Sequence, residues 1–72
     1  MGMVQGMIRI NGEGAPLTAA TVAELLAQHG VNPDGKGVAV AVNGAVVRRQ
    51  AWTETKLSAG DDVEIVRVRQ GG

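Results

Sequence analysis

In three segments of the chain large apolar residues stand two positions apart, and this spacing predicts three β-strands. The segments are residues 7–10, 38–42 and 63–69. Successive side chains of a strand point to opposite faces of a sheet, so each segment can bury one face and expose the other. In the last segment Val63 and Ile65 share one face. We assign that face to the core, together with the three valines of residues 38–42.

Two Asn-Gly pairs, at residues 11–12 and 43–44, predict tight hairpin turns, because this pair accepts the positive φ angles that such turns require. Each turn predicts a returning strand, over residues 13–18 after the first turn and over residues 45–48 after the second. Pro16 lies within the first returning strand. Since proline has no amide hydrogen to donate to a neighbouring strand, we expect this strand at an edge of the sheet.

One short helix is predicted between the two hairpins. Thr21 and Glu24 form a capping box, in which the threonine hydroxyl accepts from the amide of Glu24 and the glutamate side chain accepts from the amide of Thr21. Four residues then fall on one stripe at the spacing i, i+3, i+4 and i+7, namely Val22, Leu25, Leu26 and His29. Gly30 supplies the left-handed conformation that ends the helix. Because about two helical turns are unstable alone, the helix must pack on the sheet.

The elements follow in the order ββαβββ, and residues 50–57 form a loop that contains a short helical turn. A hairpin, one helix across its face and further strands predict an α+β roll of the β-grasp type. We expect a mixed sheet of four to five strands with one main helix packed on one face. We assign residues 1–6 to an N-terminal extension or an expression remnant, residues 7–68 to the β-grasp domain and residues 69–72 to a flexible C-terminal tail.

Composition and charge argue against several classes of function. The chain has 72 residues, seven basic and seven acidic side chains, and no cysteine. A nucleic-acid-binding protein is normally more basic, and a chain without thiols has no disulfide, thiolate metal site or thiol nucleophile. No apolar run reaches membrane-spanning length, and no targeting segment is visible. We therefore expect a cytoplasmic monomer that binds neither nucleic acid nor membrane.

Candidate catalytic groups are few. His29 is the single histidine, and it lies at the expected end of the helix, where a histidine commonly has a structural role. Asp61 and Asp62 follow Gly60 in a predicted turn, where aspartates commonly bond to local backbone groups. Residues 35–37 lack the spacing of a phosphate-binding loop. We therefore expect no catalytic residue, no metal ligand and no bound cofactor.

The sheet face opposite the helix is predicted to carry an apolar surface. Val66 and Val68 alternate onto that face, where Ala39 and Ala41 of an earlier strand are also expected. A flat apolar patch on a small domain often marks a docking surface, although single exposed valines are common. We favour docking, because several of these residues would be neighbours on one face.

Five stretches distributed over residues 7–72 carry a resemblance to a known family. They are MIRING, TVAELL, VAVNGAVVRRQAW, LSAGDDVEIV and the terminal GG. They resemble the ThiS family, the sulfur carrier proteins of thiamine biosynthesis with a ubiquitin-like β-grasp fold. The strongest local match is formed by Asn43, Val47, Arg49 and Trp52. Arg48 departs from the pattern, since many relatives have a proline there, and we expect Arg49 and Trp52 to be structural.

The resemblance implies a function for the C-terminal glycines. In the family, a ubiquitin-activating-type adenylyltransferase uses ATP to adenylate the terminal carboxylate. A sulfur donor such as a cysteine desulfurase converts it to a thiocarboxylate, and thiazole synthase receives the sulfur. Carried over to this chain, Gly72 holds the adenylate and then the thiocarboxylate, and Gly71 lets the tail thread a narrow channel. The resemblance implies a carrier and not an enzyme, with ATP bound by its partner.

Four residues before the glycines are candidate partner contacts. We expect Val66 and Val68 to hold the domain on its partners, and Arg67 and Arg69 to pair with acidic groups beside the channel. For both arginines, a solvated strand end explains the sequence equally well.

Several other functions are compatible with the sequence. The small subunit of molybdopterin synthase resembles this chain in fold and chemistry, but its relatives usually end with a proline-containing, alanine-glycine-glycine tail. A carrier of cysteine or another metabolite is a further alternative. Two alternatives belong to other classes, a ubiquitin-like protein modifier and a non-covalent β-grasp interaction module.

Overall fold

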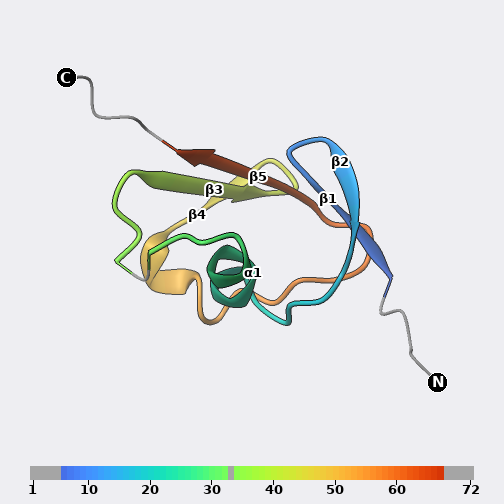
Figure 1. The fold of residues 1–72 in the computed structure, drawn as a ribbon, viewed down its shortest axis with the longest axis horizontal. Coiled ribbons are helices and arrows are strands. Elements are labelled where there is room, and N and C mark those ends of the chain that lie inside the picture. The colour runs from blue at the N-terminus through green and yellow to red at the C-terminus, as the bar shows by residue number, and fades with distance from the viewer. Residues whose placement is uncertain (1–5, 33, 68–72) are drawn as a thin grey trace.

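The computed structural model describes residues 6–32 and 34–67, and it confirms the expected order of elements (Figure 1). Two strands precede a single α-helix, two further strands follow it, and a 3₁₀ turn leads toward the last strand. The elements are β1 (Met7–Ile10), β2 (Glu13–Pro16), α1 (Val22–Gln28), β3 (Val38–Val42), β4 (Ala45–Val47), η1 (Arg49–Ala51) and β5 (Asp62–Arg67).

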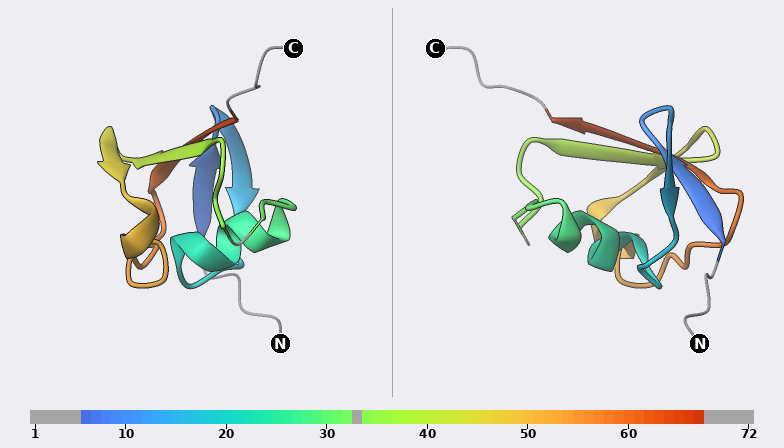
Figure 2. Two further views of the ribbon diagram at one scale, coloured as in Figure 1. Left: turned by 90° about the vertical axis from the view of Figure 1, so that its left-hand side faces the viewer. Right: turned by 45° about the vertical axis from the view of Figure 1, so that its right-hand side comes forward.

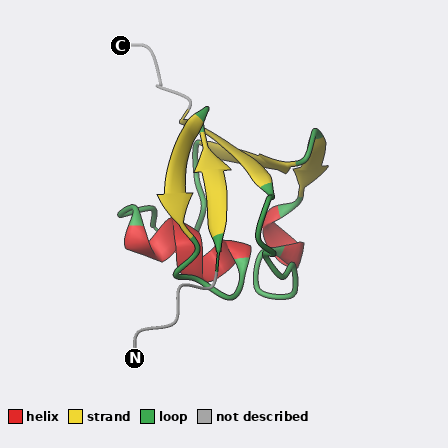
Figure 3. Cartoon of the chain, turned by 90° about the vertical axis from the view of Figure 1, so that its right-hand side faces the viewer, coloured by secondary structure: helices red, strands yellow, loops and turns green. Residues whose placement is uncertain are grey.

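The five strands form one sheet in the order β2-β1-β5-β3-β4. Strand β5 pairs in parallel with β1 and antiparallel with β3, and a hairpin completes each side of the sheet. Among the described residues, α1 and η1 lie on the same side of this sheet, and the other side carries no helix (Figure 2 and Figure 3). A mixed sheet covered on one face by the main helix is the β-grasp architecture, and the predicted fold class is confirmed.

Both Asn-Gly turns adopt the predicted conformation. The φ angle is 52° at Asn11 and 53° at Asn43, and the glycines that follow have φ angles of 85° and 84°. Positive φ at both central residues is typical of the type I′ turn, whose twist matches that of paired strands. Such a two-residue turn sets the register of its hairpin, so that Val42 pairs with Ala45 directly beside the second turn.

Two strands are shorter than predicted. Strand β2 ends at Pro16, although the amide of Leu17 still donates to the carbonyl of Gly6 at 2.8 Å. Its place at the edge of the sheet confirms the expectation drawn from the proline. Strand β4 ends at Val47, and Arg48 is the cap residue of the 3₁₀ turn that begins at Arg49. Strand β5 is described as far as Arg67, and the predicted extension over residues 68–69 lies outside the described residues.

The helix has the predicted N-terminal cap but differs from the prediction in two details. The amide of Glu24 donates to Thr21 Oγ1 at 3.2 Å, as expected. The Glu24 carboxylate accepts from the amide of Ala20 at 2.8 Å, and the predicted bond to the amide of Thr21 is wrong. His29 is exposed and does not lie on the buried stripe, because α1 ends one residue earlier and His29 turns away with a φ angle of −97°. Gly30 then takes the predicted left-handed conformation.

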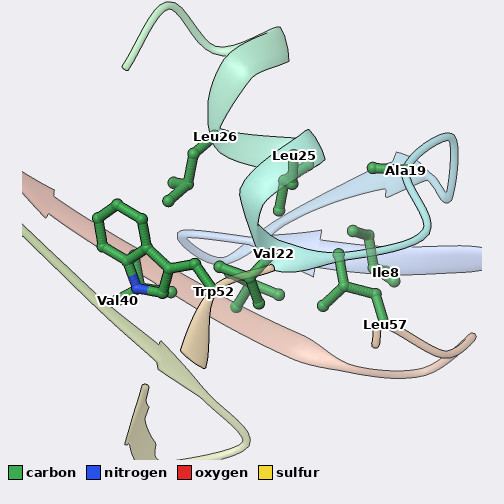
Figure 4. Close-up of a cluster of buried hydrophobic side chains, with 9 residues drawn as sticks. Ile8, Ala19, Val22, Leu25, Leu26, Val40, Trp52 and Leu57 are labelled. Carbon is green, nitrogen blue, oxygen red and sulfur yellow. The ribbon is translucent and has the colours of Figure 1, made fainter. Parts of the chain in front are cut away.

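One hydrophobic core lies between the sheet, α1 and the loop that precedes β5 (Figure 4). Its buried residues are Ile8, Ala19, Val22, Leu25, Leu26, Val40, Trp52, Leu57 and Val63. Val40 and Val63 are almost fully enclosed, which confirms the core face assigned from alternation. The indole Nε1 of Trp52 donates to the carbonyl of Val47 at 3.0 Å, so the polar edge of this buried ring is satisfied. Trp52 is thus structural, as expected.

Two valine-to-alanine substitutions in neighbouring strands separate core packing from strand propensity. Val40 is 1% exposed and Val46 is 78% exposed. We expect Val40→Ala to lower the free energy of unfolding by about 2 kcal/mol, through lost burial and the cavity that remains. We expect Val46→Ala to change it by less than about 0.5 kcal/mol. Urea denaturation followed by the fluorescence of Trp52 measures both, and equal losses would contradict the assigned core.

Candidate functional site

Strand β5 has two different faces, and it is the element that leads toward the C-terminus. Val63 is buried and Ile65 packs against the core on the helix side. Glu64 and Val66 alternate onto the uncovered side of the sheet, where Val66 is 56% exposed. The structure therefore places Val66 on the face where the sequence placed it.

Val66 belongs to an apolar patch that spans three neighbouring strands. It pairs with Ala39 of β3, and Ala41 of β3 pairs with Val46 of β4. We name Ala39, Ala41, Val46 and Val66 the open-face patch. These residues contribute, with Glu64, to a shallow depression of about 170 Å³. An exposed apolar patch on a small domain often marks a docking site.

Val46 is a patch residue that the interpretation of the sequence missed. The signal was present, because a two-residue turn pairs Val42 with Ala45 and therefore Ala41 with Val46. Directly opposed residues of two strands point to the same face. Once Ala41 is assigned to the uncovered face, Val46 must accompany it.

Arg67 makes an interaction that the sequence did not predict. The sequence was compatible with a partner contact or with a solvated strand end. The Nη2 of Arg67 donates to the backbone carbonyl of His29 at 2.7 Å. The last carbonyls of a helix lack intrahelical donors and carry the negative end of the helix dipole, so a guanidinium is a favourable partner there. Arg67 thereby links the end of β5 to the end of α1. The other predicted site residues, Val68, Arg69, Gly71 and Gly72, lie outside the described residues.

The segment after β4 explains why the departure at Arg48 is tolerated. Arg48 has a φ angle of −67° and a ψ angle of 149°, the extended conformation that a proline would also adopt. An arginine at this position therefore leaves the strand end unchanged. The guanidinium of Arg49 donates to the carbonyl of Asp34, which ties the 3₁₀ turn to the loop after α1. Arg49 is structural, as expected.

The acidic turn before β5 also has a structural role. Asp61 accepts hydrogen bonds from the amide of Ser58 at 2.8 Å and from the Asn43 side chain at 3.0 Å. Within residues 6–32 and 34–67, no three metal-ligating side chains come together. Over the same ranges, no helix is long and apolar enough to cross a membrane.

The fold, the open-face patch and a central strand that runs toward a Gly-Gly ending place the chain in the class of ubiquitin-like β-grasp domains. The family model described as "ThiS family" matches residues 8–72. The curated sulfur carrier protein ThiS of Thermus thermophilus is 39% identical over 66 residues, which are 92% of this chain and 100% of that protein. The chain belongs to the ThiS family, whose members are sulfur carriers and not enzymes.

Solved structures agree with this assignment. The crystal structure of the thiamine biosynthesis protein ThiS from Geobacter metallireducens superposes with a TM-score of 0.74 at 32% identity, covering 92% of this chain and 99% of that chain. A solution NMR structure of a thiamine biosynthesis protein from the same organism has the same TM-score and identity, covering 92% of this chain and 87% of that chain. The β-grasp fold of this chain is therefore that of the family.

The bond from Arg67 to the helix end predicts a loss of stability when the guanidinium is removed. We expect Arg67→Ala to lower the free energy of unfolding by about 1 kcal/mol, since a charged donor is lost from a partly exposed carbonyl. Arg9→Ala is the matched control, because Arg9 is exposed on the uncovered side of β1. Thermal unfolding of both variants tests this, and equal effects would show that the bond does not stabilise the domain.

Proposed function

We propose that the protein carries sulfur for the biosynthesis of the thiazole of thiamine. An activating enzyme of the ubiquitin-activating type adenylates the carboxylate of Gly72 with ATP. The terminal persulfide sulfur of a donor such as a cysteine desulfurase then displaces AMP and forms an acyl disulfide. A thiol reduces this disulfide and releases the thiocarboxylate, which donates its sulfur to thiazole synthase. The observation that supports this most strongly is membership of the ThiS family, in a chain that ends with Gly71 and Gly72. Because the reaction consumes ATP, the cytoplasm is the location that fits it.

The proposed chemistry suits the residues at the C-terminus. A carboxylate is a poor electrophile until one oxygen becomes part of a good leaving group, and adenylation provides that group. Glycine has no Cβ, so Gly71 and Gly72 fit a narrow channel that leads to the nucleotide. The chain has no cysteine. Cargo sulfur therefore has no thiol to occupy, and the terminal carboxylate is the remaining site for it.

The open-face patch is proposed as the surface that docks on the activating enzyme. It lies on β3, β4 and β5, and β5 also leads to the reacting terminus, so docking there would direct the tail toward the nucleotide. We extend the same proposal to Val68 and Arg69 as partner contacts. For Arg67, the bond to the carbonyl of His29 favours a role inside the domain over a partner contact.

Transfer of sulfur into thiamine is favoured over the alternatives by the relatives. The matched proteins are described as a sulfur carrier ThiS and as thiamine biosynthesis proteins. The thiamine pathway is therefore the destination that we propose for the sulfur.

Intact mass spectrometry tests the carrier chemistry. Incubation with ATP, the cognate activating enzyme and a sulfur donor is expected to raise the mass by the exchange of one oxygen for one sulfur. Deletion of Gly72 is expected to abolish this change while leaving the melting temperature unaltered, because the buried core residues that the structure describes lie between Ile8 and Val63. An unchanged mass with several activating enzymes would contradict the proposal, and lysine-linked adducts would favour a protein modifier.

A charge placed in the open-face patch tests the docking surface. We expect Val46→Asp to raise the KM of the activating enzyme for this protein about tenfold or more, because a carboxylate would be buried against the partner without a counter-ion. Thr53→Asp adds the same charge at an exposed position beside η1, on the helix side. This control is expected to leave KM within about twofold, and similar effects of both variants would rule out the patch as the docking site.

A further inference from the structure

The last half of β5 lacks a strand on one of its two sides. The parallel ladder between β1 and β5 contains Arg9 opposite Asp62 and Ile10 opposite Val63, and it extends no further. On the other side, the ladder with β3 continues to Arg67. Beyond Ile10 the chain of β1 turns away, because the next residue begins the first hairpin turn. Within the described part of the chain, residues 64–67 of β5 would thus have one neighbouring strand only.

The side chain of Asn11 occupies the place of the missing strand. Its Oδ1 accepts from the amide of Ile65 at 2.8 Å, and its Nδ2 donates to the carbonyl of Ile65 at 3.2 Å. The backbone amide of Asn11 donates to the carbonyl of Val63 at 2.8 Å. A carboxamide has one acceptor and one donor group in the geometry of a peptide unit. Asn11 therefore continues the ladder by one residue with its side chain, after its backbone has left.

The second Asn-Gly turn provides a natural comparison. Asn43 has nearly the same φ angle as Asn11, 53° against 52°. Its Oδ1 accepts from the amide of Asp62 at 2.9 Å, and its Nδ2 donates to the Asp61 carboxylate at 3.0 Å. The two Asn-Gly turns thus bind β5 at two different points. Asn43 holds the start of the strand, and Asn11 holds Ile65, two residues before Arg67.

We propose that Asn11 is a positioning residue for the reacting C-terminus. By holding both polar groups of the Ile65 backbone, it sets the direction in which the chain leaves the domain after Arg67. This inference rests on the proposed function, since the consequence of that direction is delivery of Gly72 to the nucleotide of the activating enzyme. Without the carboxamide, the end of β5 keeps its pairing with β3 and the bond from Arg67 to His29, but it is free to swing on the β1 side.

Two glycine substitutions test the inference, because glycine accepts positive φ and removes the carboxamide without adding charge. Hydrogen exchange is measured at the amides of Val66 and Glu64, which pair with Ala39 and Ala41 of β3 on either side of Ile65. We expect Asn11→Gly to raise the exchange rate of Val66 relative to Glu64 about five- to thirtyfold, the factor that one or two lost hydrogen bonds carry. Asn43→Gly, the matched control, is expected not to raise this ratio. A ratio unchanged by Asn11→Gly would overturn the inference.

Steady-state activation supplies the functional measurement. With the open-face patch intact, we expect Asn11→Gly to lower kcat about five- to tenfold and to leave KM within about twofold. Asn43→Gly is expected to leave both constants within about twofold. If both variants lower kcat in proportion to lost stability, the role of Asn11 is merely structural and the inference is wrong. A wild-type protein that is never adenylated would overturn the proposed function, and the exchange ratio would still decide whether Asn11 holds the strand.

Asn11→Asp is a second variant that keeps the side-chain shape. Its carboxylate can still accept from the amide of Ile65, but it presents a second oxygen to the Ile65 carbonyl in place of a donor. We expect the Val66 exchange ratio to rise in this variant as well. A ratio equal to that of the wild type would show that the donated bond at 3.2 Å contributes nothing to the position of β5, and would overturn the inference.

Discussion

The parallel pairing of β1 with β5 is the interaction on which the rest of the structure depends. Through this pairing β5 lies between the β1–β2 hairpin and the β3–β4 hairpin, with β1 on one side and β3 on the other. Only in this position do Val40 and Val63 reach the same core beneath α1. The same position brings Val66 beside Ala39 and creates the open-face patch. The pairing is short, and the Asn11 side chain extends it toward the C-terminus.

The sequence predicted those parts of the fold that local chemistry determines. Both hairpins follow from Asn-Gly pairs, the helix start follows from Thr21, and the core face follows from strict alternation. The partner of the Glu24 carboxylate was wrong by one residue, because neighbouring amides at a helix start compete for the same acceptor. The residues Asn11 and Ile65 are 54 positions apart in the sequence, and a local sequence pattern does not predict such a contact. The strand order likewise depends on the assembled sheet.

The candidate site was predicted only in part, because some of its contacts join elements that lie far apart in the sequence. Alternation placed Val66 on the uncovered face, and the register of a two-residue turn could have added Val46. The link between Arg67 and the helix end depends on how α1 crosses the sheet, which a strand pattern does not contain. The two faces of β5 thus differ in their surroundings. One face packs against the core and lies toward the helix, and the other is the face that we propose for docking.

The most direct test is to map by NMR cross-saturation which residues contact the cognate activating enzyme in the full-length carrier. The account predicts that signal loss concentrates at the open-face patch, on Ala39, Ala41, Val46 and Val66, and spares the exposed residues of α1 and η1. Signal loss centred on α1 and η1, with the patch unaffected, would contradict the claim that the uncovered face of β5 and its neighbours presents the reacting terminus.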